Sequence, residues 1–166
     1  FSKMCFDEDF IEQKTALSLL EPLIYLKSEI SLNNNNLDSK KTKNEVDRFW
    51  LNITKNDKDK SREMIRVFYN RVILSNKLFT SYKEGWKTDR GMLLIILGLP
   101  ENIKIGSNKE IWTYKSKEKG DVCSFTFYKT NNFFNNNDFN LERNPSYKRI
   151  WDEAINTWLK GDIYIY

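Results

Sequence analysis

Histidine is absent from this sequence of 166 residues, and with it a large part of enzyme chemistry. Ser-His-Asp and Cys-His catalysis, general base catalysis by imidazole and histidine-containing zinc sites all need a residue that the chain lacks. Cysteine is scarce too, because only Cys5 and Cys123 occur. Two cysteines far apart in the sequence are too few for a four-cysteine zinc site, and their spacing does not demand a disulfide.

Motifs for nucleotides, calcium and membranes are also missing. The sequence has no P-loop and no Gly-x-Gly-x-x-Gly after a strand, and the acidic segment at Asp57 lacks the glycine and the final glutamate of an EF-hand. No stretch approaches the roughly 20 apolar residues of a membrane span, and no signal peptide is visible. We therefore expect no cofactor, no bound metal and no transmembrane span in this sequence.

The charge of the chain is mild and scattered. The net charge is +4, and lysine and asparagine supply much of the polar surface. No cluster of lysine and arginine coincides with a run of exposed aromatic residues, which a stacking platform for nucleic acid would require. We therefore expect no nucleic-acid partner. Apolar residues make up 40% of the chain, enough for one core of ordinary size.

Composition divides the chain into three parts. Residues 1–32 are expected to form an N-terminal helical segment that ends a preceding region, although residues 23–32 also alternate like a strand. Residues 33–43 are rich in asparagine and lysine and are predicted to be a linker and solvated loop. Residues 44–166 are predicted to be the main domain.

Periodicity within the main domain predicts an α+β fold. A 3–4 spacing of apolar residues from Asn44 onward indicates one helix, and Ser61 is a candidate N-cap for a second. Beyond residue 100 the period changes to two, which indicates an antiparallel sheet of three or four strands. A helix is expected to begin at Pro145, which suits the first position of a helix. We predict helices packed on the aromatic face of this small sheet.

Residues 85–100 combine a turn, a short apolar segment and a sharp stop. Thr88 or Asp89 could accept hydrogen bonds from the first amides of a helix. Met92–Leu97 is apolar on nearly every side, as in a helix enclosed by other elements. Gly98 and the proline that follows favour a helix end. A buried strand is the alternative for so short an apolar run.

The pentapeptide at residues 85–89, Gly-Trp-Lys-Thr-Asp, resembles the signature of the GWxTD-domain family of Bacteroidetes-type bacteria. Further blocks extend the resemblance over residues 46–162. These blocks are Phe49-Trp50, Tyr69-Asn70-Arg71-Val72 with Asn76 and Phe79, Arg90-Gly91, Gly98-Leu99-Pro100-Glu101, Glu110-Ile111-Trp112-Thr113-Tyr114, Phe125 to Phe127, and Arg143-Asn144-Pro145 with Trp151. The resemblance implies an exported envelope protein and supplies no catalytic residue. More weakly, the short helix and the Trp-x-Tyr hairpin resemble outer-membrane assembly lipoproteins of the SmpA/OmlA type.

We interpret the residues of the motif as structural. They are Gly85, Trp86, Thr88, Asp89, Arg90, Gly91, Gly98, Pro100 and Trp112. Arg90 could bind a carboxylate or phosphate ligand, but we favour a structural role for it, either an internal pair with a carboxylate or stacking on Trp86 or Trp112. Packing in the core is the favoured role of the tryptophans.

The asparagine-rich segment 131–140 is predicted to be a loop. It places Phe133, Phe134 and Phe139 among polar residues. Exposed aromatic side chains of this kind are typical of a partner surface, and the alternative is that they fold back onto the sheet.

Without histidine, an enzyme would be left with carboxylate chemistry, for example Asp89 with Glu84 or Glu110. We therefore expect a non-catalytic protein. The resemblance to the GWxTD-domain family implies a protein-interaction subunit of a bacterial cell-envelope complex, in outer-membrane protein assembly or secretion. Its expected location is the periplasm or the periphery of the outer membrane, and its expected partners are outer-membrane and other envelope proteins. The alternative is an envelope enzyme that acts on glycan through carboxylates.

Overall fold

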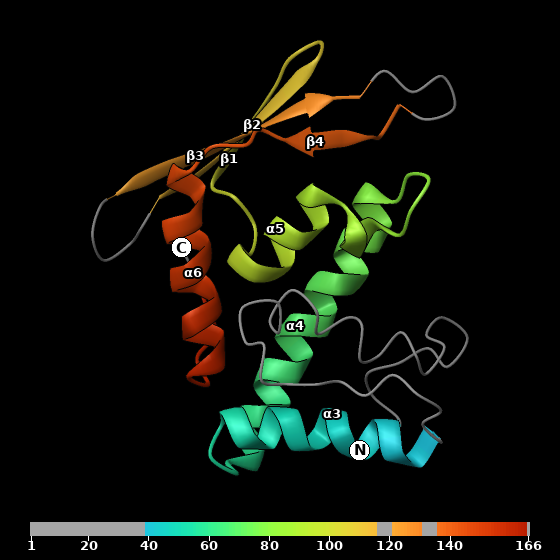
Figure 1. Cartoon of the computed structure of the whole chain (residues 1–166), viewed down its shortest axis with the longest axis vertical. Coiled ribbons are helices and arrows are strands. Elements are labelled where there is room, and N and C mark those ends of the chain that lie inside the picture. Colours follow the sequence, from blue (N-terminus) through green and yellow to red (C-terminus); the bar gives the residue numbers. More distant parts are fainter. Residues whose placement is uncertain (1–38, 116–120, 131–135, 166) are drawn as a thin grey trace. The chain divides into compact units, whose positions relative to one another are not determined.

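The computed structural model describes residues 39–115, 121–130 and 136–165. The contacts of these residues form two compact units: unit 1 comprises residues 39–69 and Thr157–Ile163, and unit 2 comprises the described residues of Asn70–Asn156 together with residues 164–165. Helices α4 (Lys58–Phe79) and α6 (Ser146–Leu159), which are labelled in Figure 1, each contribute residues to both units. The predicted N-terminal segment, residues 1–32, lies outside the described residues.

Three aromatic side chains form the centre of unit 1. Helix α3 (Ser39–Ile53) contributes Trp50, helix α4 contributes Phe68 and the end of α6 contributes Trp158, and all three are fully buried. The ring centroids of Trp50 and Phe68 are 5.3 Å apart and those of Phe68 and Trp158 are 5.6 Å apart, both edge to face. This geometry is favourable for aromatic rings beyond the area that they bury.

Two helix starts in unit 1 differ from the prediction. Helix α3 begins at Ser39, so residues 39–43 are helical although we expected them in the linker. Lysine is a good helix former, and its abundance alone does not indicate a loop. Helix α4 begins at Lys58, where Asp57 Oδ1 accepts a hydrogen bond from Lys60 N at 3.0 Å. Ser61, the predicted cap, lies buried inside the first turn, because Asp57 offers an equally good capping side chain earlier in the chain.

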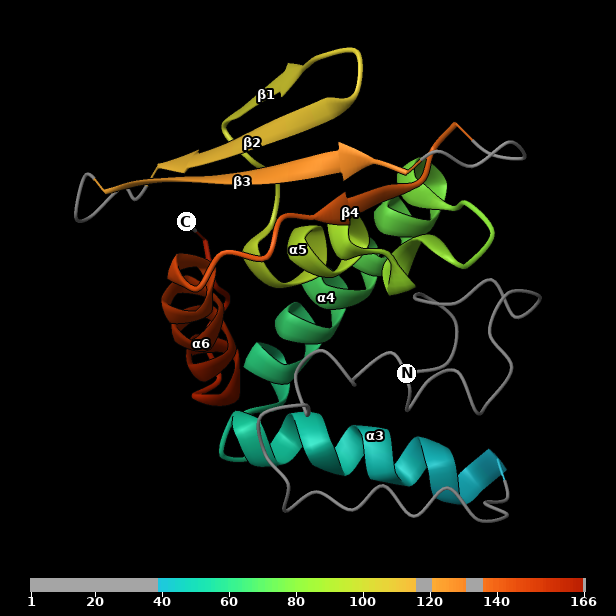
Figure 2. The ribbon, with the colours of Figure 1, turned by 45° about the horizontal axis from the view of Figure 1, so that its top comes forward.

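Unit 2 contains an antiparallel sheet of four strands in the order β1-β2-β3-β4 (Figure 2). The strands are β1 (Asn102–Ile105), β2 (Lys109–Lys115), β3 (Val122–Lys129) and β4 (Phe139–Leu141). Side chains alternate along each strand. One face of β2 and β3 therefore carries four buried aromatic residues: Trp112, Tyr114, Phe125 and Phe127. The predicted α+β class is confirmed, and this aromatic face is the one that meets the helices.

The apolar segment of the motif is a helix and not a strand. A 3-10 turn, η1 (Gly85–Lys87), leads into helix α5 (Asp89–Leu97), whose last five residues are all buried. The helix ends at Gly98 with φ +88°, a backbone angle that glycine adopts without a steric penalty. Figure 2 shows α5 lying beneath the sheet, next to β4. Among the described residues, no helix combines the length and the apolar character needed to cross a membrane.

Candidate functional site

The two glycines of the motif allow backbone segments to approach one another closely. A Cβ atom on Gly85 would come within 3.0 Å of the backbone of Ser75 and Asn76 in α4, and a Cβ on Gly91 would come equally close to the carbonyl of Gly85. Real Cβ atoms do not approach backbone atoms so closely. Both glycines are therefore required by packing in three dimensions.

Thr88 joins the 3-10 turn to α5. Its Oγ1 accepts a hydrogen bond from Gly91 N at 3.0 Å and donates one to the carbonyl of Gly85 at 2.7 Å. Trp86 is 4% exposed, and its backbone N–H donates to Asn76 Oδ1 at 3.1 Å. Of the two predicted caps, Thr88 is the actual N-cap residue of the helix.

Asp89 has a different role from the predicted cap. Its Oδ2 accepts a hydrogen bond from the backbone N–H of Leu141, in β4, at 2.7 Å. The carboxylate at the start of α5 thus binds a backbone donor of the shortest strand in the sheet. Because Leu141 is far away in the sequence, no local pattern indicated this contact.

Arg90 is buried, with 3% of its surface exposed, and the contacts described below all lie within unit 2. Nη1 donates to Glu110 Oε1 at 3.0 Å, and Nη2 donates to the carbonyl and the side-chain oxygen of Asn137 at 2.8 and 2.6 Å. The guanidinium carbon lies 4.8 Å from the ring centroid of Phe79 and 4.2 Å from that of Phe139. Burial lowers the pKa of Arg90, and Glu110 counteracts this shift.

The predicted internal pairing of Arg90 is therefore observed, but its aromatic neighbours are not the predicted ones. Phe79 and Phe139 take the place of Trp86 and Trp112. Phe139 begins β4 and is half-buried over the guanidinium, so it folds back onto the sheet and does not extend from a loop. Phe133 and Phe134 lie outside the described residues.

Arg71, to which the sequence assigned no role, holds the other end of α5. Its Nη1 donates to the carbonyl of Ile95 at 3.0 Å and its Nη2 to that of Tyr164 at 3.1 Å. The hydroxyl of Tyr114 donates to the carbonyl of Gly98 at 3.1 Å. Burial lowers the pKa of Arg71 to about 10. An arginine among the apolar residues of a helix was the one feature of the sequence that could have indicated this role.

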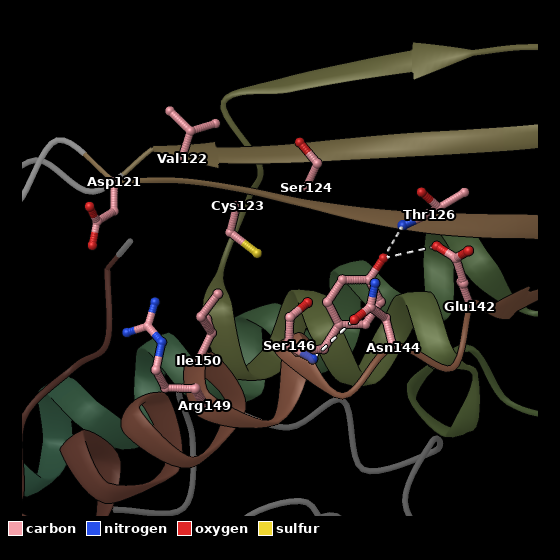
Figure 3. A pocket seen from close by; sticks show the side chains of 11 residues that line it. Asp121, Val122, Cys123, Ser124, Thr126, Glu142, Asn144, Ser146, Arg149 and Ile150 are labelled. Atoms are coloured by element: carbon pink, nitrogen blue, oxygen red, sulfur yellow. Dashed lines mark hydrogen bonds between the residues drawn. The ribbon is translucent and has the colours of Figure 1, made fainter.

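An open hollow of about 740 Å³ lies beside β3 and the start of α6 (Figure 3). Cys123 and Arg149 point into it from the strand and the helix, and burial raises the pKa of the free Cys123 thiol. The hydroxyl of Tyr147 accepts a hydrogen bond from Thr126 N and lies 3.3 Å from Glu142 Oε2. The described residues contain no group of three potential metal ligands.

The sequence model of the GWxTD domain matches residues 1–160. The chain belongs to the GWxTD-domain family. The match begins further upstream than the blocks that carried the resemblance, so the family's characteristic pattern includes the chain before α3. No curated protein and no solved structure matches this GWxTD chain, and the likeness to SmpA/OmlA-type lipoproteins receives no support from structural neighbours.

The signature of the GWxTD domain can now be described in physical terms. Its glycine permits close backbone contact, its threonine caps α5 and its aspartate binds β4. The arginine that follows joins α5 to β2 through Glu110. These polar side chains are engaged inside the chain, which is what a structural role of the motif requires.

Proposed function

We propose that this GWxTD-domain protein is a non-catalytic, protein-interacting subunit of a bacterial cell-envelope complex that serves outer-membrane protein assembly or secretion. The location in the envelope rests on the family. The interaction role rests on one structural observation, a group of large apolar side chains exposed at one edge of the sheet. Leu99, Ile103 and Ile105 are 69%, 44% and 77% exposed. Apolar side chains gathered at one place on a surface are typical of binding sites for other proteins.

The proposal is tested by purification from native membranes in mild detergent, followed by identification of the associated proteins. We expect outer-membrane proteins to co-purify with the wild-type chain. Ile103→Lys should lose them, because a charge is placed in the apolar group. Ile73→Lys is the matched control, since Ile73 is 55% exposed but lies on α4. The proposal would be contradicted if the wild-type chain purified as a monomer with no associated protein.

The alternative, an envelope enzyme acting on glycan, needs two facing carboxyl groups. Asp89 accepts a hydrogen bond from Leu141 N, and Glu110 pairs with Arg90. Glu84 is exposed and pairs with Lys87. Asp121 and Glu142 both line the hollow beside β3. However, Glu142 N bonds to the carbonyl of Thr126, five residues after Asp121, so the two backbones lie ~16 Å apart along the strand. Figure 3 shows the carboxylates of Asp121 and Glu142 at opposite ends of the hollow, so they do not face one another. In a glycosidase pair the two carboxyl groups face one another, at most about 9.5 Å apart.

A further inference from the structure

Strand β1 lies at the edge of the sheet. It pairs with β2 on one side, and no described strand lies on its other side. All four of its residues are exposed. An edge strand of this kind presents backbone donors and acceptors to which another chain can bind.

The register shows which backbone groups point outward. Gly106 N donates to the carbonyl of Lys109, and these two residues continue the ladder that sets Ile105 opposite Glu110. In an antiparallel ladder, hydrogen-bonded pairs alternate with pairs that are not hydrogen-bonded. Lys104 is therefore bonded to β2, whereas Ile103 and Ile105 direct their N–H and C=O groups away from it.

The two faces of β1 differ in chemistry. Ile103 lies directly opposite Trp112, so Ile103 and Ile105 share the aromatic face of the sheet. Both remain exposed, as does Leu99 just before the strand. Lys104 lies on the opposite, outward face. An incoming strand would therefore meet apolar side chains on one face and a cation on the other.

The outward face of the whole sheet is positively charged. Its described strand positions include Lys104, Lys109 and Lys115, and they contain no aspartate or glutamate. Lys109 is the diagonal neighbour of Lys104 across the ladder, about 7–8 Å away between Cα atoms. The charge that complements this face is negative.

We propose that β1 is a docking edge for an extended segment of another protein, in which apolar and acidic residues alternate. The segment adds a fifth strand beside β1. Its backbone bonds to Ile103 and Ile105, its apolar side chains lie beside these two isoleucines, and its carboxylates lie beside Lys104. This mode of recognition, β-strand addition, derives affinity from the backbone and specificity from alternate side chains. The inference deepens the proposed function, on which it rests, by naming the surface and the chemistry of the partner.

A second copy of this chain is a poorer occupant. The antiparallel register that overlaps residues 103–105 of two copies would set Lys104 directly opposite the Lys104 of the other copy. Like charges directly opposite one another destabilise a strand pair.

The opposite side of the sheet provides an internal comparison. Strand β4 pairs only with residues 127–129 of β3, so the first part of β3 is a second edge, beside the hollow of Figure 3. Asp121 and Glu142 line this hollow together with Arg149. The carboxylates of an acidic segment would be repelled by Asp121 and Glu142 at this edge, so we expect the segment to bind β1 instead.

The probe is a blocked synthetic peptide of about seven residues with alternating valine and glutamate, compared with a valine–lysine peptide. Binding is followed by amide exchange and NMR on the full chain. We expect the amides of Ile103 and Ile105 to exchange about tenfold more slowly with the glutamate peptide only. Lys104→Glu should reverse the preference, whereas Lys148→Glu, which makes the same charge change on α6, should leave it unchanged.

Two variants at one position test the role of the backbone. Ile105→Pro removes an outward N–H without removing a bond to β2, and proline is tolerated on edge strands. It should abolish peptide binding, whereas Ile105→Val should retain it. Equal binding of the two peptides, protection at Ser124 in place of Ile103, or undiminished binding by Ile105→Pro would each overturn the inference.

The two proposals fail in different ways. If the same envelope proteins co-purify with the wild-type chain and with the Ile105→Pro variant, the proposed function stands and β1 is not the docking edge. If the glutamate peptide slows amide exchange in β1 but no envelope protein co-purifies with the wild-type chain, the edge binds acidic strands and the proposed function fails.

Discussion

At the scale of single residues, the GWxTD motif acts through the shape and the hydrogen-bonding groups of its side chains. Gly85 and Gly91 leave no space for a Cβ atom. Thr88 both accepts and donates a hydrogen bond within one turn of chain. Arg90 uses the planar shape of its guanidinium, since it lies between two aromatic rings while it binds Glu110. These are demands of shape and hydrogen bonding, and lysine in place of Arg90 would not meet them, because it lacks the planar guanidinium.

Gly85→Ala should destabilise the protein strongly. The added methyl group would collide with the backbone of α4, which cannot move as a side chain can. We expect a loss of about 3 kcal/mol in the free energy of unfolding, measured with urea. Gly106→Ala is the control, because a Cβ there would lie 3.3 Å from the nearest atom, the carbonyl oxygen of Lys109, and φ is not positive. Its cost should stay below about 1 kcal/mol. Equal stability of the two variants would show that the turn can relax.

Arg90→Met should leave the carboxylate of Glu110 buried without its cation. The side chains of Arg90 and Glu110 are 4% and 12% exposed, and breaking a buried pair from one side costs about 3–5 kcal/mol. Adding Glu110→Gln should restore part of the stability, because the unpaired charge is then removed. A double-mutant cycle in urea measures this coupling. Arg62→Met, which breaks an exposed pair with Asp59, should cost less than about 1 kcal/mol. Additive losses at Arg90 and Glu110 would contradict the interpretation.

At the scale of elements, α5 and β4 are too short to be stable alone. A helix of nine residues and a strand of three depend on contacts with the rest of the chain. Arg71 binds the C-terminal end of α5 and Thr88 caps its start. Asp89 connects the helix to β4. The motif therefore stabilises two marginal elements by joining them.

Asp89→Ala should release β4 from α5. The amide of Leu141 loses its acceptor, and a hydrogen bond to a charged group contributes about 1.5–3 kcal/mol. We expect amide exchange at Leu141 to accelerate by about tenfold or more, with little change at Phe125 in the middle of the sheet. Asp89→Asn keeps an acceptor oxygen and should show a smaller effect. Unchanged protection at Leu141 in the alanine variant would mean that pairing with β3 alone holds β4.

At the scale of the whole molecule, the free energy of unfolding is expected to depend on pH in the alkaline range, where buried tyrosine and arginine side chains titrate. Without histidine, no side chain of ordinary pKa titrates between pH 5 and 8. Tyr69 and Tyr114 are 3% and 1% exposed, and burial raises the pKa of both phenols. Burial also lowers the pKa of Arg71 to about 10.

Stability should therefore fall above about pH 10. The unfolded chain releases the phenolic protons near pH 10 while the folded chain retains them, so each buried tyrosine lowers the free energy of unfolding by ~1.4 kcal/mol per pH unit. Arg71 acts in the opposite direction, because its folded form loses its proton first, but two tyrosines outweigh one arginine. Urea unfolding between pH 8 and 11 measures the slope. Tyr114→Phe should flatten it by ~1.4 kcal/mol per unit, and the exposed Tyr82→Phe should not. Equal slopes in both variants would contradict this assignment.

Much of the fold follows from local and periodic features. The cap at Thr88, the stop at Gly98 and the period-two strands depend on residues that are close in sequence, and the structure confirms them. The start of α3 was missed, because a lysine-rich segment has the same composition in a helix as in a loop. Phe139 was assigned to a loop for a similar reason, since its neighbours in sequence are polar whereas its neighbour in space is Arg90.

The sequence by itself determined the family, the α+β class and the turn and stop of the motif, and it favoured a helix between them. Only the tertiary structure decided that Asp89 binds Leu141, that Gly85 lies against α4, and that Ile103 and Ile105 stay exposed. Capping and periodicity depend on neighbours within a few residues of the chain. Partners and exposure depend instead on where distant segments meet, and the alternating isoleucines of an edge strand look the same in sequence as those of a covered one.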